Sequence, residues 1–203
     1  WNGLMLKGLC DAYRAFNKRE YLDLALKNAE FINNNLFNPT GILKRVYNSL
    51  SADWRKGQGG AAFLDDYANI IDAFIALYEV TFDIQWLNQA KLLTDNVINH
   101  FYDRNNGIFY YTSEGDEQLI ARKSEIMDGV IPSSNSVMAR NLKKLGLLFE
   151  EENCTNISTQ LLQNIFPLIA KYRSSYSNWA TLLQEAIFGL YEDNDGWATA
   201  LLT

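Results

Sequence analysis

Residues 64–101 read LDDYANIIDAFIALYEVTFDIQWLNQAKLLTDNVINHF and carry a clear periodic pattern. Their apolar positions recur every three or four residues, which is the spacing of one face of a helix. The pattern breaks once, at Phe82-Asp83, and then resumes. The stretch therefore predicts two helices joined by a short turn. The apolar positions are Tyr67, Ile70, Phe74, Leu77 and Tyr78, then Trp86, Ala90, Leu93, Val97 and Phe101.

Similar helix pairs are predicted on both sides of this stretch. One covers residues 1–37 and another 133–173, against about 63–103 for the central pair, and a further helix covers about 178–191. The three pairs begin near Asn2, Asp65 and Ser134, which are 63 and 69 residues apart. Such regular spacing is typical of repeated helical hairpins rather than of an irregular bundle.

Connections within the pairs are short, whereas those between pairs, 38–62 and 105–132, are long. This organisation predicts an all-α fold in which one helix of each pair lies inside and the other outside, as in part of an (α/α)6 toroid. Long connections in compact folds often carry function. Within the second one, Gly107–Thr112 alternates aromatic residues and predicts a short strand.

Polar and aromatic residues gather at the expected starts of the inner helices. If these helices run side by side, their first turns form a cup of amides, hydroxyls, carboxylates and aromatic rings, a surface suited to sugars. The alternative is that the same residues only cap their helices. The candidate binding residues are Trp1, Asn2, Asp65, Tyr67, Ser134 and Asn135, together with Arg122 on a connection.

Two carboxylates are the candidates for acid–base catalysis. Adjacent helical residues point about 100° apart, so one of Asp65 and Asp66 can cap the helix while the other faces the cup. Asp128 precedes the third pair at the same expected end. We predict Asp66 and Asp128 as the acid–base pair, with a hydrolase or hydratase favoured over an epimerase. Arg122 either contacts an anionic group or pairs with nearby acids, and 54–60 is predicted to form a flap.

Composition argues against several classes of function. The 203 residues have 18 Lys and Arg against 24 Asp and Glu, a net charge of −6, and no basic stripe for nucleic acid. No apolar run approaches the roughly 20 residues of a membrane span. Cys10, Cys154 and His100 have no metal-binding or redox spacing, so neither a metal nor a cofactor is predicted. Both cysteines are expected to be buried free thiols.

Four motifs resemble the C-terminal region of the spermatogenesis-associated protein 20 family. They are Trp1–Met5 (WNGLM), Ala62–Ala68 (AFLDDYA), Leu77–Asp83 (LYEVTFD) and Asp128–Val137 (DGVIPSSNSV). The resemblance implies a thioredoxin-like domain followed by a six-hairpin toroid similar to those of N-acylglucosamine 2-epimerases and six-hairpin glycosidases. It also implies that the first hairpins and the thioredoxin-like domain precede Trp1. One departure is Ser134, where the family usually has Gly.

These observations leave two hypotheses. The first is a toroid domain that binds or processes a carbohydrate-like small molecule, and the second is a non-catalytic scaffold attached to the thioredoxin-like domain. An incomplete ring would expose apolar helix faces, so self-association or instability is expected if these residues stand alone. The related epimerases use a pair of histidines, whereas this sequence contains only His100, so the resemblance does not extend to that mechanism. The compartment stays open, with the cytoplasm favoured.

Overall fold

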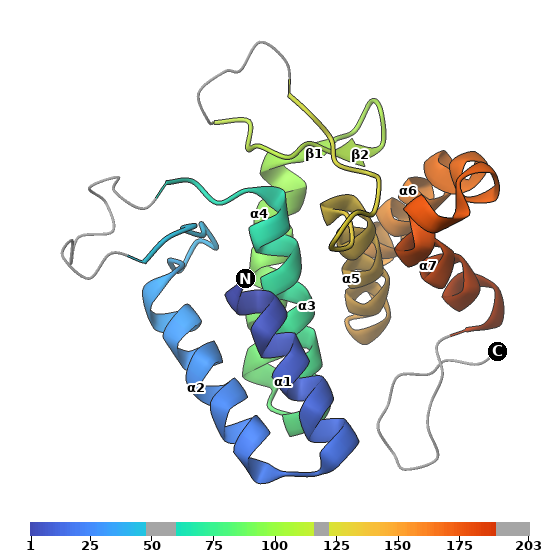
Figure 1. Ribbon diagram of the computed structural model, residues 1–203. Helices are drawn as coiled ribbons and strands as arrows, with labels where there is room; N and C mark the ends of the chain where they lie inside the picture. The colour runs from blue at the N-terminus through green and yellow to red at the C-terminus, as the bar shows by residue number, and fades with distance from the viewer. Residues whose placement is uncertain (48–59, 116–121, 190–203) are drawn as a thin grey trace. The chain divides into compact units, whose positions relative to one another are not determined.

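The computed structural model describes residues 1–47, 60–115 and 122–189, and within them it is predominantly helical (Figure 1). The chain divides into two compact units, 1–102 with 110–123 and 103–109 with 124–203, and each is described by itself. The first unit contains α1 (Asn2–Phe16), α2 (Arg19–Asn35), α3 (Leu64–Thr81) and α4 (Ile84–His100). The second contains α5 (Ser134–Leu148), α6 (Glu152–Lys171), the 3₁₀ helix η2 (Arg173–Tyr176) and α7 (Ser177–Phe188).

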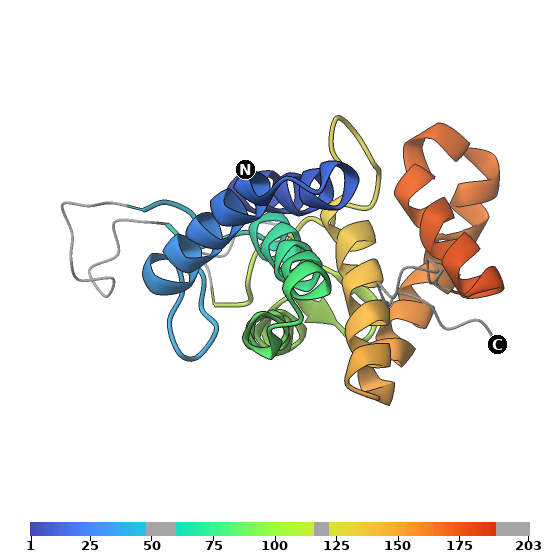
Figure 2. The same cartoon turned by 90° about the horizontal axis from the view of Figure 1, so that it is seen from below.

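In the first unit, α1 packs against both α2 and α3, and α3 packs against α4, as both views show (Figures 1 and 2). Helix α3 is the most buried of the four, because nearly every apolar side chain along it is covered. The Phe74 ring lies 5.5 Å from the Trp86 ring of α4. The periodic positions that predicted the central hairpin therefore form the core of this unit.

Helices α1 and α3 approach each other closely at one end. A Cβ atom on Gly3 would lie 2.8 Å from the backbone carbon of Asn69, so only glycine fits there. Farther along, the guanidinium of Arg14 pairs with the buried carboxylate of Glu79. The start of α1 is thus held against the first turns of α3.

The short turns within the helix pairs share one backbone feature. Asn17, Phe82 and Glu150 have φ angles of 49°, 54° and 54°, in the left-handed region. The first two end α1 and α3 by donating their backbone N–H to Tyr13 and Tyr78. Three different side chains therefore adopt the conformation that glycine favours at helix ends.

The long connections are anchored to the ends of the helices. The Leu43 N–H donates to the Tyr67 hydroxyl over 2.8 Å, which ties the α2–α3 connection to α3. In the next connection, β1 (Tyr102–Asp103) pairs with β2 (Ile108–Phe109), so the strand predicted within 107–112 is present. The predicted flap at 54–60 lies outside the described residues except for Gly60.

In the second unit, α5 packs against α6, and α7 packs against both. The Ser158 hydroxyl of α6 donates to the Ala139 carbonyl of α5 over 2.7 Å. The fully buried Trp179 of α7 donates its indole N–H to the Ile126 carbonyl over 2.8 Å. Apolar burial and a few internal hydrogen bonds therefore fix α7 against the rest of the unit.

Both cysteines are buried free thiols, as predicted. Burial raises the pKa of the Cys10 thiol to about 12, so Cys10 is an unreactive core residue. Within the described residues, no three His, Cys, Asp or Glu side chains are grouped to hold a metal ion. None of the helices in the described ranges combines the length and apolar character needed to cross a membrane.

Candidate functional site

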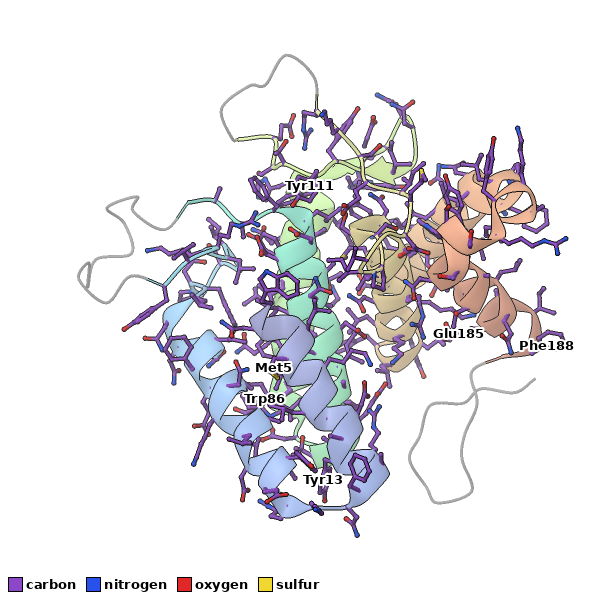
Figure 3. The ribbon with its side chains drawn as sticks, in the orientation of Figure 1. Met5, Tyr13, Trp86, Tyr111, Glu185 and Phe188 are labelled. Carbon is purple, nitrogen blue, oxygen red and sulfur yellow. The ribbon has the colours of Figure 1, made fainter. Side chains whose placement is uncertain are left out.

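Five side chains gather where α3 begins, and we call this group the α3 corner. The Leu64 N–H at the start of α3 donates to the Tyr111 carbonyl over 3.0 Å, so residue 111 lies at this end of the first unit (Figure 3). The members come from three segments that are far apart in sequence. They are Arg45, Phe63, Asp65, Asp66 and Tyr111.

Two aromatic rings and one guanidinium form the frame of the α3 corner. The Phe63 and Tyr111 rings stack with centroids 4.8 Å apart and an interplanar angle of 29°. The Arg45 guanidinium lies 4.5 Å from the Phe63 centroid. Its side chain is 40% exposed, so the frame remains open to solvent.

Asp66 is the inner carboxylate of the α3 corner, with 19% of its side chain exposed. One oxygen accepts from the Phe63 N–H over 3.0 Å, which is half of a capping box. The same oxygen lies 3.7 Å from Arg45 Nη1. Burial raises the pKa of the Asp66 carboxyl, although the Phe63 N–H and Arg45 oppose this.

Asp65 faces a different set of donors. Its Oδ1 accepts from the Asp66 N–H over 2.9 Å. Burial, and then the negative charge of Asp65, raise the pKa of the Tyr111 hydroxyl. The Asp66 carboxylate thus caps α3, whereas the Asp65 carboxylate accepts from the backbone of the first turn. Two adjacent carboxylates consequently occupy different environments at the same helix start.

Trp1 and Asn2 belong to the same unit as the α3 corner. Gly3, on the first turn of α1, contacts α3 directly. The Trp1 side chain is 89% exposed and Asn2 is exposed as well. The first turns of α1 and α3 therefore bring an indole ring and carboxylates into the same region.

Tyr67 and Arg122 are already engaged within the first unit. Tyr67 is buried, and its hydroxyl accepts from the Leu43 N–H. The Arg122 guanidinium lies 4.3 Å from the Tyr110 ring and donates to the carbonyls of His100 and Thr112. These contacts give both residues a structural role, and their predicted binding roles stay predictions.

The second unit contains another carboxylate cluster, the Asp128 hub, formed by Asp128, Ser133, Ser136 and Asn178. Asp128 Oδ1 accepts from the Ser133 N–H over 2.9 Å and lies 3.0 Å from Ser136 Oγ. Its Oδ2 accepts from the Asn178 N–H over 2.8 Å. Asp128 thereby holds the starts of α5 and α7 together.

Ser134 and Asn135 lie beside the Asp128 hub and are buried. The Asn135 side chain bonds both the N–H and the carbonyl of Phe109, and it also donates to the Glu125 carbonyl. The Ser134 hydroxyl has no hydrogen-bond partner among the described residues, and the residue is 2% exposed. Asn135 therefore anchors β2, whereas Ser134 contributes an unsatisfied polar atom.

Arg45, Phe63 and Tyr111 were absent from the predicted site. Arg45 and Tyr111 lie in connections whose path the helical periodicity does not describe. The aromatic alternation around Tyr111 predicted a strand and gave no indication of its partner. Phe63 had a local signal, since it immediately precedes the first turn that contains the two aspartates.

The chain is similar in sequence to spermatogenesis-associated protein 20. It is 32% identical to the mouse protein over 156 residues, which are 71% of this chain and 19% of that protein. It is also 35% identical to an uncharacterized protein of Caenorhabditis elegans over 154 residues, 75% of this chain and 21% of that protein. The chain thus spans about a fifth of the length of these relatives. No protein-family model matches it.

Solved structures share the fold at low sequence identity. D-mannose isomerase aligns with a TM-score of 0.60 and 13% identity over 81% of this chain and 39% of that one. The GH76 alpha-mannanase of Bacteroides thetaiotaomicron aligns with a TM-score of 0.59 and 16% identity, over 100% and 62%. Cellobiose 2-epimerase of Bacillus thermoamylovorans gives 0.56 and 16%, over 81% and 43%. These matches confirm the predicted class of α/α-toroid hairpins.

Proposed function

We propose that this chain, which is homologous to part of spermatogenesis-associated protein 20 as its motifs predicted, binds a neutral carbohydrate-like small molecule at the α3 corner. The observation that carries the proposal is the grouping of two carboxylates, a stacked aromatic pair and an arginine at one partly exposed helix start. Carboxylates and arginine hydrogen-bond hydroxyl groups, and exposed aromatic faces stack on the apolar faces of sugar rings.

Charge and exposure indicate the kind of ligand. The α3 corner has two carboxyl groups and a single cation, Arg45, so we do not expect it to favour an anionic sugar. The exposed Trp1 ring offers an additional stacking surface in the same unit. The names of the toroid structures, an isomerase, a mannanase and an epimerase, agree with a sugar ligand.

Asp66 is our candidate for acid–base chemistry on the bound molecule. A carboxyl whose pKa is raised by burial keeps its proton closer to neutral pH and can donate it. Asp128 remains the second predicted catalytic carboxylate, although its oxygens already accept several hydrogen bonds. A hydrolase or hydratase fits these groups better than an epimerase that depends on two histidines.

A non-catalytic scaffold is the second candidate, and one observation favours it. Asp66 caps α3 and lies near Arg45, while Asp65 accepts a hydrogen bond from the Asp66 N–H, so each carboxylate has a structural partner. In this alternative the α3 corner only fixes the α2–α3 connection. The whole protein would then use its toroid to hold other domains, such as the predicted thioredoxin-like one.

Isothermal titration calorimetry separates these candidates. The titrants are D-glucose, D-mannose, N-acetylglucosamine, cellobiose and mannobiose, and the proteins are the unaltered chain and Asp66→Asn. Asp83→Asn is the matched control, because Asp83 caps α4 with an exposed side chain. We expect saturable binding of at least one sugar that Asp66→Asn weakens about tenfold, as for a lost charged hydrogen bond, and Asp83→Asn leaves unchanged.

Two other sets of results would contradict the proposed sugar site or indicate a folding effect. Absence of binding across the panel, or binding that Asp66→Asn leaves intact, would reject the α3 corner as a sugar site and favour the scaffold. Equal losses in Asp66→Asn and Asp83→Asn would indicate a general effect on folding. Circular dichroism of the three proteins would identify that case.

A further inference from the structure

We infer that this chain pairs with a second copy of itself through an uncovered apolar side of α1. This side, which we call the α1 face, follows one stripe of the helix in steps of three or four residues. Its members are Trp1, Met5, Gly8, Ala12 and Phe16. The inference goes beyond the proposed function, because the carboxylates of the α3 corner take no part in it.

The large side chains of the α1 face are open to solvent. Trp1, Met5 and Phe16 are 89%, 61% and 65% exposed, and Figure 3 labels Met5 on this helix. On the opposite side of α1, Leu6 and Cys10 are fully buried. A helix at a protein surface normally has polar residues opposite its buried stripe, whereas a helix that is apolar all round is normally covered. We therefore expect α1 to have a second packing partner.

The charged residues of α1 lie beside the α1 face and are engaged elsewhere. Lys7 donates to the Asp11 carboxylate over 2.8 Å, and Arg14 donates to it over 3.3 Å. Arg14 also pairs with Glu79 of α3. A two-fold pair brings each residue near its axis close to its own counterpart, so a charge there would meet a like charge. The α1 face has no charge, which favours a second copy as its partner.

Helix α2 of the same unit has an exposed side of the ordinary kind. Asp23, Lys27 and Glu30 are exposed there beside the apolar Leu24 and Phe31. Charged side chains interrupt the apolar ones, as is typical of a helix that faces water. The uninterrupted apolar pattern is thus a property of α1 and not of every exposed helix side in the first unit.

The sizes of the side chains on the α1 face suit an antiparallel pair of helices. Gly8 and Ala12 lie at the middle of the stripe, with larger residues at both ends. A Cβ atom on Gly8 would meet no atom within 4 Å, so a second helix can approach there. A two-fold axis beside these small residues brings Met5 of each copy toward Ala12 of the other, and Trp1 toward Phe16.

The area of the α1 face is that of a weak dimer. Fully covered aromatic side chains bury about 150–250 Å² each, so covering Trp1, Met5 and Phe16 removes roughly 400 Å² per copy and roughly 800 Å² in the pair. The half-buried Leu4 and Leu9 beside the stripe add to this area. Weak and transient complexes bury less than about 1,200 Å² in total. The pair is therefore expected to form and separate reversibly.

Sedimentation equilibrium of the chain without any sugar tests the pairing. We expect a monomer–dimer equilibrium with a dissociation constant on the order of tens of micromolar. Met5→Lys places a charge within the contact and should raise this constant at least about tenfold. Leu24→Lys is the matched control, because Leu24 is 52% exposed on α2 and lies outside the α1 face. It should leave the constant unchanged.

Gly8→Gln tests the close approach of the two helices. A longer side chain has room at Gly8 in a single copy, and glutamine favours a helix more than glycine does. We expect the dilute variant to be at least as stable to heat as the unaltered chain, whereas its dissociation constant rises about tenfold. An unchanged constant would overturn the crossing beside Gly8.

Two results would overturn the pairing itself. A chain that stays monomeric at every concentration would exclude a second copy and leave the α1 face to a helix of another polypeptide. Equal weakening by Met5→Lys and Leu24→Lys would exclude α1 as the contact. Because sedimentation needs no ligand and the titrations need no dimer, either proposal can fail without the other.

Discussion

The α3 corner and the Asp128 hub have one feature in common. Each places an aspartate where a helix start needs a hydrogen-bond acceptor. Asp66 accepts one backbone N–H, and its neighbour Asp65 accepts another, from Asp66 itself. Asp128 instead accepts from two backbone N–H groups and contacts a buried serine. Both residues are aspartates, so residue type does not distinguish them. The number of hydrogen bonds that each carboxylate already accepts distinguishes a structural carboxylate from a candidate reactive one.

The largest effect should come from removing the carboxylate of the Asp128 hub. Asp128→Ala leaves the Ser133 and Asn178 N–H groups without their acceptor and removes the Ser136 contact, and we expect a loss of about 3 kcal/mol of unfolding free energy. Asp83→Ala, which removes an exposed cap, should cost about 1 kcal/mol. Urea unfolding followed by circular dichroism measures both. Equal costs would mean that the hub is no more structural than an ordinary cap.

The next effect tests the close packing of α1 against α3, the helix at whose start the α3 corner lies. Gly3→Ala places a methyl group against the backbone of Asn69, and we expect about 2 kcal/mol of destabilisation from overpacking. Gly8→Ala on the same helix meets no atom within 4 Å, so it should stabilise the protein by up to about 1 kcal/mol through helix propensity. Thermal unfolding of the two variants checks the opposite signs. A stable Gly3→Ala protein would show that α1 is not held against α3.

Ser136, a member of the Asp128 hub, can be compared with Ser134, which lies beside the hub. Ser136 Oγ lies 2.8 Å from Asn178 Nδ2 and near Asp128, so Ser136→Ala should cost about 1 kcal/mol. The Ser134 hydroxyl is buried and has no partner in the part of the chain that the structure describes, so Ser134→Ala should be neutral or slightly stabilising. Chemical denaturation compares the pair. A marked loss in Ser134→Ala would reveal a partner for that hydroxyl.

The smallest effect concerns the pH dependence of the α3 corner. Because the pKa of Asp66 is higher in the folded protein than its ordinary value of 3.8, the folded state binds the proton more tightly than the unfolded chain does. Asp66 therefore favours folding more as the pH falls through this raised pKa toward 3.8. Asp66→Asn lacks this gain, so the stability of the variant relative to the unaltered chain should be greatest at neutral pH and decrease on acidification. Urea unfolding between pH 7 and pH 4 measures the trend, and a relative stability that rises on acidification would contradict it.

The helical hairpins could be predicted from sequence because each buries one apolar stripe at a fixed period. Tyr67, Phe74 and Leu77 carry that signal on α3 and are buried in the structure. A capping role for one of Asp65 and Asp66 was also foreseeable, since adjacent helical residues point in different directions, but the sequence did not indicate that Asp66 would be the cap.

The partners of these carboxylates could not be predicted in the same way. Arg45 and Tyr111 reach the start of α3 through connections whose course depends on turns and backbone hydrogen bonds rather than on periodicity. Asp128 shows the complementary difficulty, because its hydrogen bond to Asn178 joins residues 50 positions apart. Sequence reasoning identified acidic residues near helix starts but not how many donors each one would meet.

The residues with left-handed backbone conformation in the short turns are positions where the stability of the protein could be increased. Phe82 and Glu150 hold a conformation in which a side chain is disfavoured and glycine is not. Both end helices at turns that contribute nothing to the α3 corner. Substituting glycine there would relieve local strain in two hairpins at once, which would give a thermostable background in which damaging variants of the corner still fold.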